Sequence, residues 1–518
     1  MAITRYTASA DNTITNAYEA NLVTRGTGSN MGYADSLEVF SIYGQESGSV
    51  NGQSAELSRI LIQFPVTQIS ADRTAGIIPA AGSVSFFLKM YNAEHPFTLP
   101  QDFTLTVAPI ARAWSEGTGL DMDEYKDLGV SNWLRSDAST SWTVVGGDYL
   151  RNDNNDVVFP RGYEDLEVDV TDVVENWILG SGGGQYDNYG FGIRLTGSQE
   201  AYFSSSAGSG VLGPGANSGS VIQNITGSRQ SYYTKKFFAR SSEFFFKRPV
   251  IEARYDSRVT DDRENFFYSS SRAPAAENLN ALYMYNYVRG RLRNIPGVES
   301  AVGLNVSFYS SSAGVPTGSK LNISIGGGTV AAGDLNTTAS FVSTGIYSCS
   351  VALTAASTRL LEIHDVWHSG GVEFFTGSFF PELMPTYDNA PTFNRITSCK
   401  NLKKSYSRKD TSRFRFFVRD RNWSPTLYTV ATANNPTEVI ESASYGIFRV
   451  IDNLAAVPYG TGSNYSTYLS YDKEGNYFDL DMELLEPDYM YEIRLSYYND
   501  SIGDWQEQPQ TFKFRVEE

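Results

Sequence analysis

The sequence predicts an all-β protein made of three β-sandwiches in series, with one short helix in the first of them. Its 518 residues include 33 Tyr and 30 Phe against only 8 Met, and 14% of the chain is aromatic. Aromatic side chains favour strands over helices. Segments in which apolar and polar residues alternate recur between turn-forming residues, as expected for the strands of sandwiches. A chain of this length can form several independent cores.

The one expected helix lies between two strands, Leu166–Val170 and Asn188–Leu195. Thr171 and Asp172 offer side-chain oxygens that would cap its first turn. Gly180 stands where a left-handed residue ends a helix. An apolar stripe at helical spacing gives it a core-facing side, made of Val173, Val174, Trp177 and Ile178.

Other segments of the first half occur in the order used by a known family: strands Ala10–Ile14, Ser36–Phe40, Leu57–Phe64 and Val84–Met90, the Trp-x-Glu turn of Ala111–Glu116, the element Ser141–Trp142, and the closing strand Arg248–Tyr255. With the helix, this order resembles the DNRLRE-type domain, a jelly-roll sandwich related to carbohydrate-binding modules. The resemblance covers roughly half the chain. It implies a jelly roll over residues 1–256, a non-catalytic module, and Trp114 and Trp177 as structural anchors, but it does not identify a ligand.

The second half divides at two places. Residues 257–277 are polar, charged and Ser-rich, and we expect a linker there. A second sandwich of about seven strands is expected over 278–392, with strands at Leu282–Val288, Leu304–Tyr309, Leu321–Ile325, Ile346–Leu353, Arg359–Val366 and Val372–Phe380. The proline-rich stretch Pro381–Pro391 marks its end.

Residues 393–518 are expected to form an immunoglobulin-like or fibronectin III-like sandwich. Leu485–Leu495 resembles the corner that precedes a late strand in these domains. In such a corner a buried Tyr hydroxyl ties the crossover loop to the sandwich, and Tyr491 is the residue expected to do so. Arg413–Arg419 and Thr511–Val516 are expected strands of the same domain.

Catalytic motifs are sparse, and we expect no enzyme. Of the three histidines, His364 and His368 are spaced to face the same way, which suits either a metal site or ordinary packing. Polysaccharide cleavage would need two opposed carboxylates. The nearest cluster of acids lies in one polar loop and is more typical of a solvated surface or a cation site than of a catalytic pair; it consists of Glu116, Asp121, Asp123, Glu124 and Asp127. The glycine pattern at Gly208–Gly213 is followed by Pro214, so no helix is there to hold a phosphate.

No cofactor is expected, with one exception to be tested. Asn152–Asp156 is rich in oxygen ligands, and Asp153 and Asp156 are the candidates for a structural Ca²⁺. A polar hairpin turn without metal is the alternative. Cys349 and Cys399 are expected to be separate thiols, because two cysteines in different domains do not make a disulfide framework.

The net charge of −17 argues against nucleic-acid binding. One basic segment, Lys400–Arg421, contrasts with this background. It is interpreted either as a solvated strand face or as a docking patch for an acidic surface, with Phe414, Phe416, Phe417 and Trp423 supplying packing nearby. The candidate interface residues are Lys403, Lys404, Arg408, Arg413, Arg415, Arg419 and Arg421.

No stretch of about 18 apolar residues is present, so no membrane partner is expected. Met1–Tyr6 lacks the pattern of a signal peptide, which favours assembly in the cytoplasm. The chain combines sandwiches in series with a Gly/Ser-rich loop, Ser204–Gly227, and two aromatic-rich stretches, Phe237–Phe246 and Tyr471–Leu485. In this combination it resembles virion structural proteins of tailed bacteriophages.

That resemblance implies a non-enzymatic component of the neck, tail or capsid surface, which is located in the virion and assembles with other virion proteins and with copies of itself. A carbohydrate-binding protein of a cell surface or of host recognition is the first alternative, and it would bind a glycan through exposed aromatic side chains. A polysaccharide-cleaving enzyme is the second.

Overall fold

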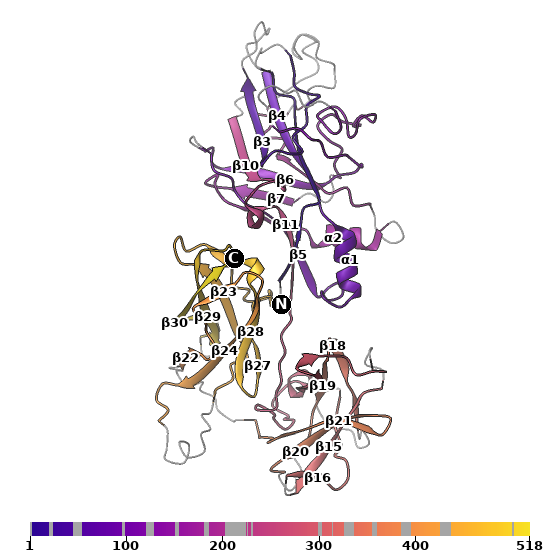
Figure 1. Ribbon diagram of the computed structural model, residues 1–518, viewed down its shortest axis with the longest axis vertical. Helices are drawn as coiled ribbons and strands as arrows, with labels where there is room; N and C mark the ends of the chain where they lie inside the picture. Colours follow the sequence, from indigo (N-terminus) through magenta and orange to yellow (C-terminus); the bar gives the residue numbers. More distant parts are fainter. Residues whose placement is uncertain are drawn as a thin grey trace. The chain divides into compact units, whose positions relative to one another are not determined.

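The computed structural model describes residues 3–19, 24–44, 54–95, 99–120, 129–150, 155–180, 186–201, 224, 226–228, 232–298, 303–312, 314–325, 336–354, 360–384, 395–424, 437–499 and 502–518. The fold is all-β, and the chain divides into two compact units, Ala2–Tyr255 and Asp256–Glu518. Figure 1 labels the main elements of both. None of the helices in these described ranges is long and apolar enough to cross a membrane.

The N-terminal unit consists of two antiparallel sheets. One has the order β1 (Ile3–Thr7), β11 (Val250–Tyr255), β5 (Val84–Met90), β8 (Leu166–Asp169). The other has the order β10 (Tyr232–Phe238), β3 (Ser36–Gly44), β4 (Ser54–Gln63), β9 (Phe191–Leu195), β6 (Phe103–Pro109), β7 (Asn155–Phe159), with β2 (Ala10–Thr15) also paired to β4. The chain crosses from one sheet to the other after β1, β4, β5, β7, β8 and β10, as it does in jelly rolls.

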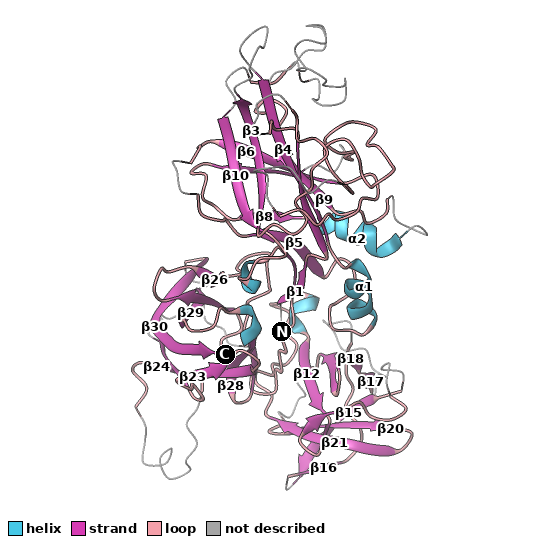
Figure 2. Cartoon of the chain, turned by 45° about the horizontal axis from the view of Figure 1, so that its top comes forward, coloured by secondary structure: helices cyan, strands magenta, loops and turns pink. Residues whose placement is uncertain are grey.

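Two helices lie where the chain passes between these sheets, α1 (Val66–Thr74) after β4 and α2 (Thr171–Leu179) after β8. Figure 2 shows them side by side in cyan. The guanidinium of Arg73 on α1 makes a bidentate ion pair with Glu175 on α2, with both N–O distances 2.6 Å. Trp177 is only 4% exposed and packs on Phe191 with 4.7 Å between ring centroids. The helices therefore contribute side chains to the core between the sheets.

The helix prediction was incomplete in two respects. Helix α1 was not expected, because Val66 and Ile69 are its only buried residues and such a short apolar pattern is weak. The predicted cap of α2 was also wrong. Thr171 makes no capping hydrogen bond; its hydroxyl oxygen accepts from the Phe86 amide of β5. Gly180 does follow the helix at positive φ, but its φ of 62° and ψ of −169° lie in the glycine-only extended region and not in the left-handed helical one.

The first part of the C-terminal unit is a sandwich with a core that includes Leu282, Val306 and Trp367. Its strands are β12 (Asn280–Tyr285), β13 (Tyr287–Val288), β14 (Arg291–Leu292), β15 (Asn305–Ser312), β16 (Val315–Thr317), β17 (Thr337–Thr338), β18 (Ser340–Ser343), β19 (Ile346–Val351), β20 (Ile363–Ser369) and β21 (Val372–Phe379). The sheets have the orders β12-β19-β18, β13-β14 and β16-β15-β20-β21, with β17 added to β15. The strand predicted at Leu321–Ile325 is absent: only an isolated bridge between Ser324 and Ala352 forms there.

The segment predicted as a linker, 257–277, is in part integral to this sandwich. Phe266 and Tyr268 are buried in its core, and Phe266 stacks on Phe379 at 4.2 Å. Arg263 pairs with Asp365 at 2.6 Å, which fixes the segment to β20. Charged residues suggested solvent exposure in the sequence, but the side chains of Asp261 and Arg263 are largely buried here, because Arg263 pairs both with Asp261 and with the distant Asp365.

The last sandwich comprises β22 (Arg395–Cys399), β23 (Ser405–Ser407), β24 (Thr411–Asp420), β25 (Ala443–Arg449), β26 (Ala455–Val457), β27 (Ser470–Asp472), β28 (Gly475–Asp481), β29 (Met490–Asn499) and β30 (Asp504–Glu517). Single turns of 3₁₀ helix occur at Phe245–Lys247, Ala275–Asn278 and Met482–Leu484. The sheets have the orders β22-β24-β28-β27 and β23-β30-β29-β25-β26, and β23 runs parallel to β30. This division of strands between two sheets is the immunoglobulin arrangement.

Tyr491 lies at the start of β29 and is 1% exposed. Its hydroxyl donates to the carbonyl oxygen of Glu486 at 2.9 Å, and its ring lies 6.1 Å from that of Phe514. The hydroxyl thus ties the crossover between the two sheets back to the domain, which is the geometry of a tyrosine corner.

Tyr491→Phe keeps the ring and removes only this hydrogen bond. The free energy of unfolding should fall by about 1–2 kcal/mol, because the Glu486 carbonyl loses a buried donor. Urea unfolding of the full chain, with hydrogen exchange of the β29 amides as the local readout, measures the change. Tyr489→Phe removes a neighbouring hydroxyl of the same corner, which is not the donor to the Glu486 carbonyl, and is the control; equal stability of the two variants would contradict a role for the Tyr491 bond.

Candidate functional site

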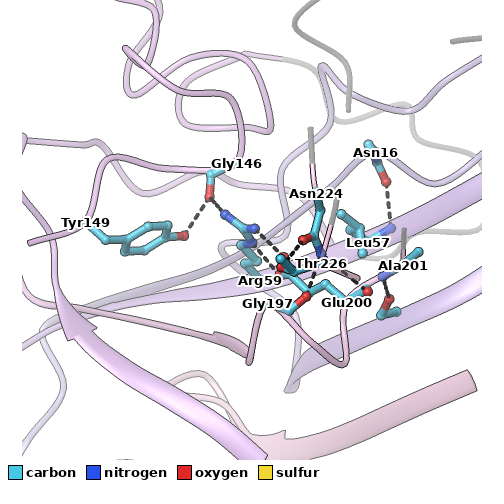
Figure 3. A network of polar contacts seen from close by, with 11 residues as sticks. Asn16, Leu57, Arg59, Gly146, Tyr149, Gly197, Glu200, Ala201, Asn224 and Thr226 are labelled. Carbon is cyan, nitrogen blue, oxygen red and sulfur yellow. Dashed lines mark hydrogen bonds and ion pairs between the residues drawn. The ribbon is translucent and has the colours of Figure 1, made fainter. Parts of the chain in front are cut away.

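A buried ion pair is the centre of the polar network in the N-terminal unit (Figure 3). Arg59 on β4 donates from Nε and Nη2 to the two carboxylate oxygens of Glu200, at 3.0 and 2.8 Å. Its Nη1 donates to the carbonyl oxygen of Gly146 at 3.1 Å, which also accepts from the Tyr149 hydroxyl at 2.6 Å. Both charged side chains are almost fully buried, so the pair holds the segments around Gly146 and Glu200 on the sheet.

Aromatic side chains close this network. The Arg59 guanidinium lies 5.5 Å from the Trp133 ring and 5.6 Å from the Tyr149 ring. A Cβ on Gly192 of β9 would come within 1.9 Å of the Tyr149 ring, so only glycine leaves room for it. Trp114 donates from its ring nitrogen to the Tyr189 carbonyl oxygen at 2.8 Å and packs against the same cluster. The predicted anchor Trp114 therefore lies in a core on the outer side of the larger sheet.

Glu116, the acid of the Trp-x-Glu turn, belongs to a second cluster in this unit. Its carboxylate accepts from the Asp11 amide at 2.9 Å and makes a bidentate pair with Arg240 at 2.8 Å. Asp11 accepts from the Arg240 amide, while its buried Oδ1 has no hydrogen-bond partner among the described residues. Burial raises the pKa of the Asp11 carboxyl to about 7. Glu116 is therefore engaged in tying three segments together.

The raised pKa of Asp11 predicts a pH dependence of stability. A carboxyl whose pKa is about 7 when folded and 3.8 when unfolded binds more protons in the folded state between these values. Its contribution to stability is complete below pH 3.8 and is lost as the pH rises toward 7. Asp11→Asn, which mimics the protonated form, should therefore become more stable relative to the natural chain as the pH rises from 4 to 8. Thermal unfolding across that range measures the difference, and parallel curves would contradict the assignment.

The other predicted ligand and catalytic residues are scattered. Asp153, Asp121, Asp123, Glu124, Asp127 and Gly208–Gly213 lie outside the described residues. Asp156 accepts from the Thr106 hydroxyl across β6 and β7 at 2.7 Å. His364 contacts the Gly377 carbonyl and His368 the Ser307 hydroxyl. Within the described ranges, no three His, Cys, Asp or Glu side chains are grouped as metal ligands, and Cys349 and Cys399 are both free thiols.

The basic segment Lys400–Arg421 is less available for docking than its charge indicates. Arg413 and Arg415 form bidentate pairs with Asp479 and Asp472 of the same domain, with N–O distances between 2.6 and 2.9 Å. Phe414 and Phe416 are fully buried in the core, so they cannot supply packing for a partner. The remaining predicted interface residues are exposed or half-buried: Lys403, Lys404, Arg408, Arg419 and Arg421.

An exposed apolar segment lies instead on the middle sandwich, at and just after strand β21, which ends its sheet. Its large apolar side chains are each at least 37% exposed and comprise Val372, Phe374, Phe375, Phe380 and Leu383. Glu373 is the one charged residue on the strand. A bulge opposite His368 leaves Phe374 outside the regular ladder. This apolar edge is a typical feature of a protein interface.

A second surface, the aromatic face, lies on the outer side of the β23-β30-β29-β25-β26 sheet and is defined by Tyr465, Tyr468, Tyr498 and Trp505. Tyr498 and Trp505 are directly opposite on β29 and β30, with 5.6 Å between their rings. Tyr468 lies 5.1 Å from Trp505 and 5.0 Å from Tyr465, which is 45% exposed. The Arg258 guanidinium lies 4.7 Å from the Tyr468 ring and is held by Asp256.

Neither surface was identified from the sequence. The exposure of β21 was not predicted, because Val372–Phe380 contains apolar residues on both sides and was interpreted only as a strand. For the aromatic face a signal exists: in Leu495–Tyr498 the positions alternate, so that Tyr498 must face outward when Leu495 and Tyr497 face the core. The partners Glu200 and Arg240 carry no such signal, because nothing local predicts their distant contacts.

No protein family model matches the sequence, and no curated protein matches it. Similar solved structures include the Ig1-2 module of the Drosophila receptor protein tyrosine phosphatase DLAR, with 7% identity over 46% of this chain and 91% of that chain and a TM-score of 0.13. Trypsin-activated alpha-2-macroglobulin from Escherichia coli has 10% identity over 92% of this chain and a TM-score of 0.15. The dimeric latent PorU from Porphyromonas gingivalis has 9% identity over 93% of this chain and a TM-score of 0.16. The chain spans 30% and 34% of the last two, and no function follows from likenesses this distant.

Proposed function

We propose that this chain is a non-enzymatic structural and interaction protein of a tailed-phage virion, held in the particle at the neck, tail or capsid surface by protein–protein interfaces. The apolar edge at β21 is the observation that carries the interaction role. Large apolar side chains gathered on an edge strand favour association, because covering them removes apolar surface from water. The proposed location in a virion is supported by the series of β-sandwiches and by the Gly/Ser-rich loop and aromatic-rich stretches of the sequence.

The ion pairs formed by two acidic side chains also support a non-enzymatic role. Glu116 and Glu200 are both bound by arginines of the N-terminal unit. A glycosidase needs one carboxyl free to donate a proton to substrate and a second free to act as base or nucleophile. These two carboxylates instead join segments that are far apart in the sequence.

The proposal is tested by the protein content of purified particles and by one substitution. Phe374→Lys places a charge on the apolar edge and should reduce incorporation into particles, because a buried unpaired charge opposes docking. Ile451→Lys, at an exposed turn of the last sandwich, makes the same chemical change elsewhere and should be incorporated normally. Absence of the natural chain from particles would refute the virion setting, and normal incorporation of Phe374→Lys would refute the edge as the interface.

A second candidate function, binding of a glycan, is favoured by the aromatic face. Half-exposed Tyr and Trp rings with polar side chains at their margins suit ligands that are themselves part apolar and part polar. Such binding is compatible with a virion protein that contacts its host.

A further inference from the structure

We propose that the aromatic face of the last sandwich is a binding site for a neutral saccharide chain; the proposal specifies the ligand of the second candidate function. Trp505, Tyr468 and Tyr498 would stack against the C–H faces of the sugar rings. Tyr465, the most exposed of the four aromatic residues, would extend the contact toward Arg258.

The arrangement of the rings is already fixed in the absence of a ligand. Trp505 packs against Tyr498, which is directly opposite it on the paired strand, and against Tyr468. The Tyr468 hydroxyl donates to the Gly462 carbonyl oxygen at 3.1 Å, and its backbone forms a bridge to Ser444 of β25. Side chains that are fixed in advance lose little conformational entropy on binding, so a weakly hydrophobic ligand can be held by a few rings.

Polar groups stand beside these rings where hydroxyl groups of a sugar would need partners. The Arg258 guanidinium is positioned by both oxygens of Asp256 while it lies against the Tyr465 and Tyr468 rings. Glu507, on the same strand as Trp505, accepts a hydrogen bond from Tyr459 at 3.2 Å and is itself exposed. A planar guanidinium and a carboxylate offer paired donors and acceptors at the margin of the apolar surface.

The charges of this surface favour a neutral ligand. Arg258 is neutralised by Asp256, whereas Asp504 and Glu507 on β30 add negative charge close to Trp505. A polysaccharide that carries carboxylates would be repelled by them. Besides Phe448, Tyr498 and the exposed Met490, the outward positions of β25 and β29 carry the buried Ser444, Gly446, Glu492 and Ser496 and the half-buried Arg494. An apolar protein interface would be richer in aliphatic side chains at its centre.

The test is affinity electrophoresis of the full chain in gels that contain galactomannan, dextran or xyloglucan as neutral polymers and alginate as an anionic one. We expect retardation by at least one neutral polymer and none by alginate. Trp505→Ala and Tyr465→Ala should weaken the interaction about tenfold or more, because each removes a stacking surface. Trp423→Ala, a half-buried Trp of the same sandwich beyond the end of β24, is the matched control and should behave as the natural chain.

Tyr465→Ala guards against misfolding of the Trp505 variant, since Tyr465 is largely outside the core. Three results would each overturn the proposal. The natural chain could migrate unaffected by every neutral polymer, it could be retarded by alginate alone, or both variants could bind as strongly as the natural chain. Failure here is distinguishable from failure of the virion proposal: Trp505→Ala chains should still enter particles through the apolar edge, whereas a chain absent from particles could still bind the polymers.

Discussion

Arg59→Met is expected to destabilise the N-terminal unit by about 3–5 kcal/mol, because it removes one member of a buried ion pair and leaves the other uncompensated. Glu200 would lose two hydrogen bonds from the guanidinium, and the Gly146 carbonyl would lose a third. Methionine fills much of the same volume, so the loss reports the missing charge more than a cavity. Denaturant unfolding of the full chain, with hydrogen exchange read in β4, measures the effect.

A second substitution separates the charge from the packing. Glu200→Gln in the Arg59→Met background removes the isolated negative charge and should restore a large part of the lost stability, giving a positive coupling energy in the double-mutant cycle. If Arg59→Met were as stable as the natural chain, the guanidinium would not be what fixes the loops onto the sheet.

Local patterns predicted the all-β class and several of the individual elements, since strand alternation is determined by neighbouring residues. Val84–Met90 was predicted as β5 with its observed bounds. The tyrosine corner also has a local signature, because Tyr491 bonds to a carbonyl only five positions earlier. Trp177 could be placed from the spacing of the apolar residues around it. These features share one property: the residues that define them are close in sequence.

What could not be predicted depends on contacts between distant residues. Arg59 and Glu200 are 141 positions apart, and Arg413 meets Asp479 across 66 positions. A basic run therefore resembled a free docking patch, although two of its arginines are paired within their own domain. Asp261–Arg263 resembled a solvated linker for the same reason, because the partner of Arg263 is Asp365 on β20. The exposure of an apolar strand such as β21 is equally invisible, since it depends on which strands happen to lie at a sheet edge.

Trp177→Ala should cost about 3–5 kcal/mol, the range found when a large aromatic residue is removed from a core. Its ring packs on Phe191 of β9, and neighbouring Val173 and Val174 bury the same side of α2. Loss of the ring leaves a cavity between the helix and the sheet, which two short helices linked by the Arg73–Glu175 pair cannot collapse to fill. The stability change should therefore be close to the upper part of that range.

Leu179→Ala provides the comparison on the same helix, because Leu179 is 62% exposed at its last turn and should change stability by less than about 0.5 kcal/mol. Urea unfolding with hydrogen exchange in α2 and β9 distinguishes the two variants. If Trp177→Ala unfolded at the same urea concentration as Leu179→Ala, the ring would not be part of the core. In that case α2 would be a surface addition, and the jelly roll would be held by its two sheets alone.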